Sequence, residues 1–198
     1  MDKKVKKGDY LDILLRSKST VFSTKDIALL WRDSNTTAAQ ERLNYYVKTG
    51  KLIRVRRGIY AKDKNYDTYE FATKILRPSY ISFESVLGSF GMTFQYYSQI
   101  FVASYVKREI IVDGQVYSFK KIKDIVLHNP AGIDQRGEYA IASKERAFLD
   151  TVYRSKNYYF DNLSPLDWDK VFMLLPMYND KKMIKRVKEY HERYKANK

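Results

Sequence analysis

The segment from Phe22 to Ala61 constrains the fold of this chain more than any other part of it. It reads FSTKDIALLWRDSNTTAAQERLNYYVKTGKLIRVRRGIYA. A short helical pattern, a polar turn and a longer helical pattern precede a glycine, a basic strand, an Arg-Gly turn and a second short strand. This order is typical of a helix-turn-helix with a wing, which presents a helix N-terminus and an arginine-bearing hairpin to a DNA groove.

The first helix of this segment has a clear start. Ser23 or Thr24 can act as its N-cap, and Ile27, Leu29 and Leu30 are expected to supply its apolar positions. The polar run over residues 32–36 then breaks the apolar pattern. We therefore expect a short helix followed by a turn.

The second helix is expected to begin after a cap at Asn35, Thr36 or Thr37. Ala39, Leu43 and Val47 repeat every four residues, which predicts a buried stripe along it. Gly50 is placed to end the helix. Beyond this glycine, residues 53–56 alternate between apolar and basic, as in a half-buried strand, and residues 59–61 return after the Arg-Gly turn.

Two sets of residues are expected to contact DNA. Base contacts are expected from the exposed face near the start of the second helix, at Thr37, Gln40, Glu41 and Asn44. Contacts to phosphates or along the wing are expected at Thr36, Lys48, Arg54, Arg56 and Arg57.

The positive charge of the chain is concentrated at its two ends. The net charge is +14; residues 1–61 carry 14 basic and 6 acidic side chains, whereas residues 62–178 carry 15 and 14. Residues 179–198 carry 8 basic and 3 acidic side chains. Solubility alone needs no such distribution, so it favours a surface that binds a polyanion.

Composition excludes several classes of protein. No long uncharged apolar run predicts a transmembrane helix, and the basic start leads into a charged amphipathic helix without the features of a signal peptide. The chain has no cysteine, which excludes disulfides and thiolate metal sites and fits a reducing cytoplasm. We expect a cytoplasmic protein that does not bind membranes.

The expected fold class is α+β with two domains. Residues 1–65 are expected to form the winged helix-turn-helix, and residues 66–198 a mixed α+β domain with a small antiparallel sheet and C-terminal helices. Asp113-Gly114 predicts a β-hairpin, and residues 122–127 are a further strand candidate. Helices are predicted over residues 69–76 and 81–90 and after caps at Ser82, Ser143 and Ser164, with a basic amphipathic helix over residues 180–198.

No catalytic motif stands out. The two histidines, His128 and His191, lie in unrelated contexts, and Asp167 and Asp169 fit the first turn of a helix better than a metal pair. Phosphate-binding and nucleophile-elbow motifs are absent. We therefore expect a protein that is not an enzyme and that needs no cofactor or metal.

Three segments of the chain resemble the AbiEi-type antitoxins of bacterial abortive-infection systems. They are GKLIRVRRGIYA at residues 50–61, PSYISFESVLGSFG at residues 78–91 and ASKERAFLDTVY at residues 142–153. Lys144 stands where that family usually has proline in the third segment. Together and in this order, the three segments are similar to the family over most of the chain.

The resemblance implies a function that the residues alone do not reveal. Such antitoxins repress their own operon by binding inverted repeats in operator DNA, an arrangement that allows cooperative dimerisation on DNA. A C-terminal domain counteracts a toxin of the nucleotidyltransferase class in a type IV toxin-antitoxin system, which serves in antiviral defence, and no stable complex with the toxin is expected. Surface residues for that activity are expected on the basic tail, at Lys181, Lys182, Lys185 and Arg186.

Other hypotheses remain open from the sequence. The chain could be a winged-helix transcription regulator whose second domain senses a ligand, which predicts an apolar pocket under the strand-rich block. It could also be a nucleic-acid enzyme, which predicts a carboxylate cluster and dependence on a divalent metal. The basic ends would also suit an anionic membrane surface.

Overall fold

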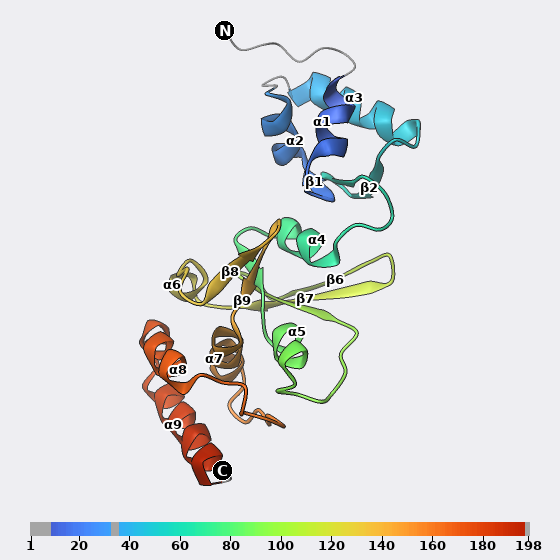
Figure 1. Cartoon of the computed structure of the whole chain (residues 1–198). Helices are drawn as coiled ribbons and strands as arrows, with labels where there is room; N and C mark the ends of the chain where they lie inside the picture. The colour runs from blue at the N-terminus through green and yellow to red at the C-terminus, as the bar shows by residue number, and fades with distance from the viewer. Residues whose placement is uncertain (1–8, 33–35, 197–198) are drawn as a thin grey trace. The chain divides into compact units, whose positions relative to one another are not determined.

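The computed structural model describes residues 9–32 and 36–196, except for the side chain of Thr36. The fold is α+β, and the chain divides into two compact units, Met1–Ile75 and Leu76–Lys198 (Figure 1). Each unit has its own sheet, so each is described by itself.

The first unit combines four helices with a three-stranded sheet in its described residues. In chain order its elements are α1 (Asp9–Arg16), β1 (Val21–Ser23), α2 (Thr24–Trp31), α3 (Thr36–Lys48), β2 (Ile53–Arg56), β3 (Ile59–Ala61) and α4 (Thr68–Ile75). The strands are antiparallel in the order β1-β3-β2. Strand β1 was not expected from the sequence, because three residues are too few to show a period.

Helix α2 begins as the sequence predicts. The Ser23 hydroxyl accepts a hydrogen bond from the Asp26 amide at 3.2 Å, and the Asp26 carboxylate accepts one from the Ser23 amide at 2.9 Å. This reciprocal pair is a capping box. The expectation that Leu29 and Leu30 supply apolar core positions was wrong, since these residues are 77% and 38% exposed. Ile27 is buried as expected, and Trp31 is buried as well.

Helix α3 ends at the predicted glycine. Gly50 has a φ of +71°, its amide donates to the Val47 carbonyl, and the Lys51 amide donates to the Tyr46 carbonyl. These two bonds form a Schellman motif, which favours glycine because its positive φ costs other residues energy. The buried stripe of α3 contains Ala39 and Leu43 as predicted; Tyr46 is more deeply buried than Val47.

The core of the first unit is mostly aromatic and aliphatic. Trp31 is its largest member, and its indole nitrogen donates to the Tyr10 carbonyl at 2.7 Å. This bond satisfies the one polar atom of the indole inside the core. Tyr10, Trp31 and Tyr46 meet in edge-to-face contacts between α1, α2 and α3.

Helix α4 is tied to strand β1 by buried charges. The Glu70 carboxylate accepts hydrogen bonds from the Thr20 amide at 2.8 Å and hydroxyl at 2.6 Å, and pairs with Lys74 at 2.7 Å. Lys74 also donates to the Val21 carbonyl. These contacts group α4 with the first unit, whereas the sequence suggested a division after residue 65.

The second unit contains a six-stranded mixed sheet in the order β6-β7-β5-β4-β9-β8. Its strands are β4 (Ser79–Ile81), β5 (Ile100–Ser104), β6 (Arg108–Val112), β7 (Gln115–Lys121), β8 (Ile133–Arg136) and β9 (Tyr139–Ala142). The expectation of a small antiparallel sheet was wrong: β4 pairs in parallel with β9, and β5 with β7. Parallel partners are distant in sequence, so local patterns do not reveal them.

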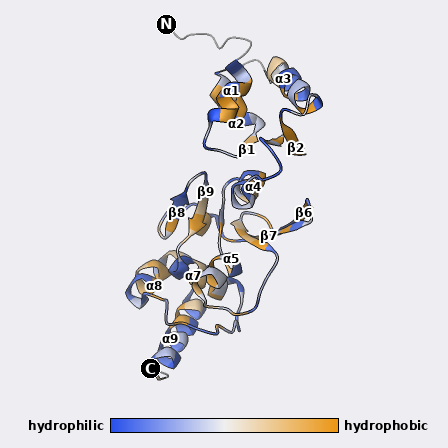
Figure 2. Cartoon of the chain, turned by 45° about the vertical axis from the view of Figure 1, so that its right-hand side comes forward, coloured by the Kyte–Doolittle hydropathy of each residue, from blue (hydrophilic) through white to orange (hydrophobic). Residues whose placement is uncertain are grey.

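Helices of the second unit pack on this sheet and on one another. They are α5 (Glu84–Leu87), α6 (Asp124–Leu127), α7 (Lys144–Arg154), α8 (Trp168–Leu174) and α9 (Lys181–Ala196), with short 3₁₀ turns over residues 88–90 and 175–178. Helix α7 lies between α5 on one side and α8 and α9 on the other (Figure 1). Helix α9 carries both hydrophobic and hydrophilic residues (Figure 2), and its buried residues Met183 and Val187 are four positions apart on one face, as the predicted amphipathic tail requires.

Local predictions for the second unit have mixed outcomes. The Asp113-Gly114 hairpin and the Ser143 cap are confirmed. Residues 124–127 form helix α6 rather than a strand. Ser82 and Ser164 are not caps, because Ser82 is buried with its hydroxyl bonded to Asp150, and α8 begins later, after Asp167.

Candidate nucleic-acid interface

The four residues predicted to contact bases lie on one face of α3. Thr37, Gln40, Glu41 and Asn44 follow a spacing of three, four and seven residues, which places their side chains in adjacent turns. Gln40 is half-buried and the other three are exposed. The face therefore offers a hydroxyl, two amides and one carboxylate within about two helical turns.

Gln40 links this face to the sheet. Its side-chain nitrogen donates to the Asn44 side-chain oxygen at 3.1 Å and to the Tyr60 hydroxyl at 2.9 Å. Tyr60 lies on β3 and is buried. Both amide hydrogens are thus used within the protein, so Gln40 positions α3 against β3 and leaves Asn44 as the better placed amide for reading a base.

The β2–β3 hairpin carries the three predicted arginines. Arg54 and Arg57 are exposed and Arg56 is half-buried. None of the three side chains forms a hydrogen bond or ion pair with another residue in the described ranges. A β-bulge at Val55, between Arg54 and Arg56, shifts the strand register by one residue.

The turn of this hairpin is hydrogen-bonded to the first residue of α2. The Gly58 carbonyl accepts from the Thr24 amide at 3.0 Å and from the Thr24 hydroxyl at 3.2 Å. The Thr24 amide is one of the donors that a helix N-terminus leaves unpaired. The hairpin turn is therefore held beside the start of α2, although its arginines form no hydrogen bond or ion pair with the described residues.

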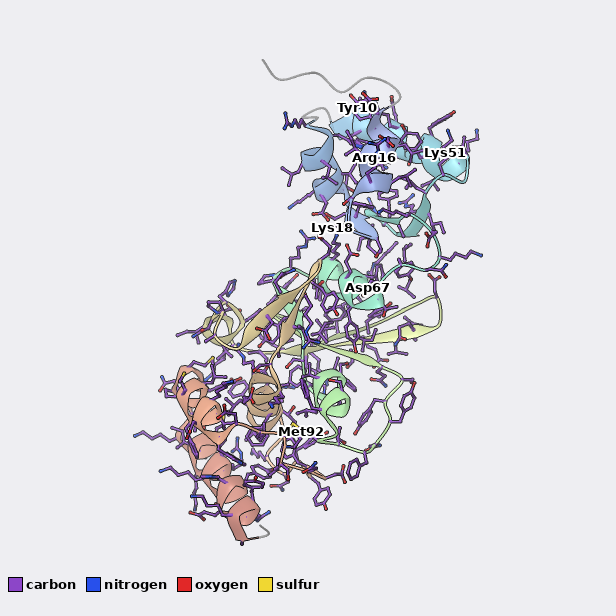
Figure 3. The ribbon with its side chains drawn as sticks, viewed as in Figure 1. Tyr10, Arg16, Lys18, Lys51, Asp67 and Met92 are labelled. Carbon is purple, nitrogen blue, oxygen red and sulfur yellow. The ribbon has the colours of Figure 1, made fainter. Side chains whose placement is uncertain are left out.

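The two remaining residues predicted to contact DNA, Thr36 and Lys48, lie at opposite ends of α3. Lys48 is exposed in the last turn of α3, at the far end of the helix from Thr37, and Lys51 follows it just beyond the helix end (Figure 3). Thr36 starts α3, but its side chain lies outside the described residues. Lys48 follows Asn44 by four residues and Glu41 by seven, so it lies on the same face of α3, one turn beyond Asn44.

The basic residues of the tail differ in their exposure and in their hydrogen bonds. Lys181, Lys182 and Lys185 are exposed on α9. Arg186 is half-buried, and its guanidinium donates to the Val152 carbonyl at 3.1 Å. Because Val152 lies in the last turn of α7, Arg186 satisfies one of the carbonyls that a helix C-terminus leaves unpaired.

A buried ion pair at the centre of the second unit was missed by sequence reasoning. Arg146 and Asp150, one turn apart on α7, are fully buried, and their closest nitrogen and oxygen are 3.4 Å apart. The Asp150 carboxylate also accepts from the hydroxyls of Tyr80 at 3.0 Å, Ser82 at 2.7 Å and Tyr178 at 2.6 Å. The carboxylate therefore has a donor for each of its main acceptor directions.

The Arg146 guanidinium is equally well satisfied. It donates to the Ala131 carbonyl at 2.7 Å, the Val126 carbonyl at 2.6 Å and the Tyr80 hydroxyl at 3.0 Å. Burial raises the pKa of Asp150, and Arg146 opposes that rise. The i, i+4 spacing of Arg146 and Asp150 was the sequence signal for this pair, but it is the same spacing that exposed helix pairs have.

Two of the three segments that carry the family resemblance meet in this network. Tyr80 and Ser82 come from residues 78–91, and Arg146 and Asp150 from residues 142–153. Their side chains bond to one another in the core, which identifies a shared structural role for two stretches that are far apart in the chain.

The histidines and aspartates considered for catalysis make packing, hydrogen-bond and helix-capping contacts in the structure. His191 packs on Trp168 and Phe172, and the His128 ring bonds the Asp124 carbonyl. Asp167 caps α8 and Asp169 lies in its first turn, as the sequence favoured. Among residues 9–32 and 36–196, no three histidine or carboxylate side chains are grouped so as to hold a metal ion.

Over the described part of the chain, every helix is too short or too polar to cross a lipid bilayer. No protein-family model matches the sequence, and comparison with curated proteins finds no significant match either.

Proposed function

We propose that this protein is a DNA-binding antitoxin that represses its own operon and counteracts a nucleotidyltransferase-type toxin. In this proposal the first unit is a winged helix-turn-helix whose helix α3 enters the major groove of an inverted-repeat operator. The β2–β3 hairpin lies against the neighbouring phosphates. The protein acts in the cytoplasm and is not an enzyme.

One observation carries the DNA-binding part of the proposal. The exposed polar face of α3 and the unpaired arginines of the hairpin belong to one unit, and the Gln40–Tyr60 hydrogen bond connects the helix to the sheet. Three neighbouring guanidinium groups without acidic partners repel one another, and an anionic backbone relieves that repulsion. Their fixed position relative to α3 suits simultaneous contact with bases and phosphates.

The antitoxin part rests on the resemblance of residues 50–61, 78–91 and 142–153 to AbiEi-type antitoxins. Two of these stretches build the core of the second unit. The second unit without its tail is nearly neutral, so its action on a toxin does not require a large electrostatic surface. We assign neutralisation to this unit, with the exposed lysines of α9 at its contact surface.

The DNA-binding part is tested by fluorescence anisotropy on the duplex upstream of the protein's own gene. We expect binding at least a thousandfold tighter than to a scrambled duplex of equal length at matched salt. Equal affinity for both duplexes would contradict a sequence-specific repressor.

The antitoxin part is tested separately by co-expression with the toxin encoded beside it. Residues 76–198 form one compact unit and are expected to restore growth without the first unit. Rescue that requires Arg54, Arg56 and Arg57 would show that neutralisation proceeds through DNA binding and would contradict this division of labour.

A further inference from the structure

A polar hollow opens between α9 and the chain segment that follows α7. One side of it, of about 350 Å³, is bordered by Lys156, Arg186 and Glu189, and an adjoining hollow of about 330 Å³ is bordered by Tyr159 and Tyr194. Both share Tyr158, Tyr159, Tyr190 and Arg193 as lining residues. This is not the apolar pocket under the strands that a ligand-sensing regulator was expected to have.

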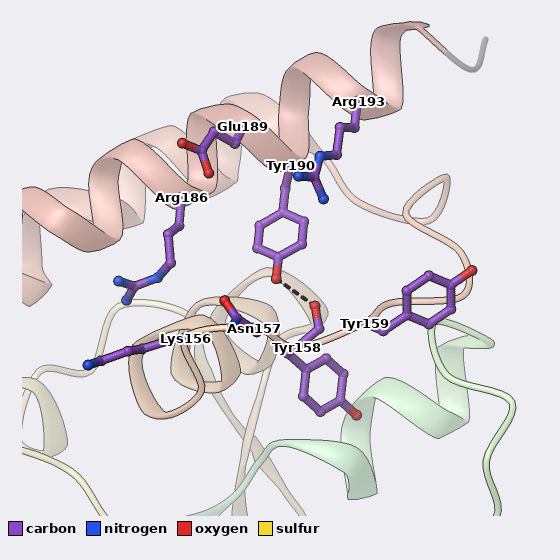
Figure 4. Close-up of a pocket in the computed structure, with 8 residues that line it drawn as sticks. All are labelled: Lys156, Asn157, Tyr158, Tyr159, Arg186, Glu189, Tyr190 and Arg193. Atoms are coloured by element: carbon purple, nitrogen blue, oxygen red, sulfur yellow. Dashed lines mark hydrogen bonds between the residues drawn. The ribbon is translucent and has the colours of Figure 1, made fainter.

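Three residues of α9 form one wall of the hollow. Arg186, Tyr190 and Arg193 are spaced by four and three residues, so they lie on one face of the helix, with Tyr190 between the two arginines (Figure 4). The Tyr190 hydroxyl donates to the Tyr158 carbonyl at 2.6 Å, and its ring packs against Phe148 and Phe160. The wall is therefore held in place by the core.

The hollow has an excess of positive charge. Three basic residues, Lys156, Arg186 and Arg193, line its two parts, against two acidic residues, Glu189 and Asp161. Across the described residues, none of these three cations forms an ion pair. Like charges around one cavity repel each other, and a bound anion would reverse that cost.

Arg186 is positioned to receive such an anion. One terminal nitrogen is held by the Val152 carbonyl, whereas its Nε is buried and has no hydrogen-bond partner. Its other terminal nitrogen forms no hydrogen bond among the described residues, and an anionic oxygen in the hollow would give this donor an acceptor. Guanidinium groups bind phosphate through paired N–H donors, so phosphate is the anion that this geometry favours.

The second hollow adds aromatic surface to the phosphate site. Tyr159 is 80% exposed, and Tyr194 also lines this hollow. An exposed ring beside an arginine offers a planar surface on which a nucleobase can stack. The two hollows are contiguous through Tyr190 and Arg193, and their size is in the range of small-ligand sites.

We propose that this hollow binds a nucleoside phosphate, with the phosphate at Arg186 and Arg193 and the base against Tyr159. The ligand is either a free nucleotide or the phosphorylated end of a single-stranded RNA, which present the same groups. This site lies within the second unit and does not depend on DNA binding by the first.

The test is calorimetric titration of the full chain with AMP, adenosine and inorganic phosphate. AMP is expected to bind at least fivefold more tightly than either fragment. Arg193→Ala is expected to weaken AMP binding about tenfold, the loss of one charge-assisted contact. Lys188→Ala, an exposed lysine on the same helix outside the hollow, is the matched control and is expected to change it less than twofold.

Two further variants separate binding from folding. Arg186→Lys keeps a cation near the Val152 carbonyl and is expected to weaken AMP binding while the thermal midpoint stays within a few degrees. Tyr159→Ala, at an exposed site, is expected to reduce AMP binding toward the affinity of phosphate alone. AMP affinity that is unchanged in both Arg193→Ala and Arg186→Lys would overturn the proposal, as would phosphate binding as tight as that of AMP.

The two ligand sources are distinguished with a 5′-phosphorylated tetraadenylate. This measurement uses the chain with Arg54, Arg56 and Arg57 replaced by alanine, so that the hairpin does not contribute. Tighter binding than AMP assigns the site to an RNA end, and weaker binding assigns it to a free nucleotide. Binding of neither ligand would overturn the proposal.

Discussion

The two units use arginine in opposite ways. In the first unit, Arg54 and Arg57 are exposed and their guanidinium groups have no partner among the described residues. In the second unit, Arg146 is fully buried and bonded to Asp150, to three backbone carbonyls and to the Tyr80 hydroxyl. Arg186 lies between these extremes, with one donor satisfied by the protein and one left unpaired.

The two kinds of arginine differ in what they can offer a binding partner. A guanidinium whose donors are all satisfied stabilises the fold and has nothing to offer a ligand. A guanidinium with unpaired donors is available to phosphate, in a duplex for the hairpin or in a small molecule for the hollow beside α9. Substitutions at the two kinds of arginine should therefore change different properties of the protein.

The largest effect is expected from breaking the buried pair. Asp150→Ala should lower the free energy of unfolding of the second unit by about 3–5 kcal/mol, because it leaves Arg146 charged and unpaired in the core. The chain has two tryptophans, Trp31 in the first unit and Trp168 in the second. Urea unfolding of a Trp31→Phe chain therefore reports on the second unit through Trp168.

The control for this experiment removes both charges. Replacing Arg146 by Met and Asp150 by Leu together should recover part of the lost stability, since no buried charge is left unpaired. Asp134→Ala, at an exposed position, should change the free energy of unfolding by less than about 0.5 kcal/mol. A small effect of Asp150→Ala would mean that the pair does not organise this core.

Alkaline pH should separate the two units through their buried tyrosines. Burial raises the pKa of Tyr80, Tyr158, Tyr178 and Tyr190 in the second unit, and of Tyr46 in the first unit, above the ordinary value of 10.0. The folded state then keeps protons that the unfolded chain releases. The stability that these tyrosines contribute is complete below pH 10.0, the ordinary pKa of tyrosine in the unfolded chain, and is lost as the pH rises above that value.

The measurement is urea unfolding from about pH 9 to about pH 11, followed through each tryptophan in single-tryptophan chains. The midpoint reported by Trp168 should fall more steeply than the midpoint reported by Trp31. Parallel decreases would contradict the expected concentration of buried tyrosines in the second unit.

Loss of the hairpin arginines should weaken binding to every duplex. Replacing Arg54, Arg56 and Arg57 by alanine is expected to reduce DNA affinity about a hundredfold at low salt and to lower the salt slope by roughly one unit per lost phosphate contact. The charge-matched control replaces Lys181, Lys182 and Lys185 by alanine. If the control and the hairpin variant lose the same affinity, binding follows net charge rather than contact at the hairpin.

Asn44→Ala should act on sequence specificity. It is expected to cost about 1–3 kcal/mol on operator DNA and little on random DNA, because an amide reads base edges rather than phosphates. Gln40→Ala should lower stability as well, since it leaves the buried Tyr60 hydroxyl without the Gln40 bond. Equal losses on operator and random DNA would reassign Asn44 to phosphate contact.

The smallest effect on stability is expected at the tail. Changing Lys181, Lys182 and Lys185 to glutamate should alter the free energy of unfolding by less than about 0.5 kcal/mol, because solvated charges contribute little. Acidic residues at Lys181 and Lys182 would also suit the first turn of α9. Growth rescue against the toxin is expected to fall, and unchanged rescue would remove these lysines from the contact surface.

Local signals account for much of the first unit. The Ser23 cap, the Ala39 and Leu43 stripe, the Gly50 stop and the strand after it all follow from residues within a few positions of each other. The same holds for the Asp113-Gly114 turn and the Ser143 cap in the second unit. Capping, helical period and turn chemistry are short-range, so a single sequence is enough to predict them.

The candidate DNA interface was only partly visible in the sequence. Its residues could be named from the face of a predicted helix and from the Arg-Gly turn. The sequence did not show that Gln40 donates its amide hydrogens to Asn44 and Tyr60, or that Arg56 is less exposed than Arg54 and Arg57. These facts depend on which side chains of β3 come beside α3.

The features that could be predicted from the amino-acid sequence are therefore local: the caps at Ser23 and Ser143, the stop at Gly50, the Asp113-Gly114 turn, and the concentration of positive charge at the two ends of the chain. Tertiary structure alone decided which strands are parallel neighbours, that Arg146 and Asp150 lie inside the core, and that Arg186 borders a hollow. The physical reason is that burial and pairing are set by partners distant in the chain. An arginine has the same local signature in solvent, in a core or at the edge of a cavity.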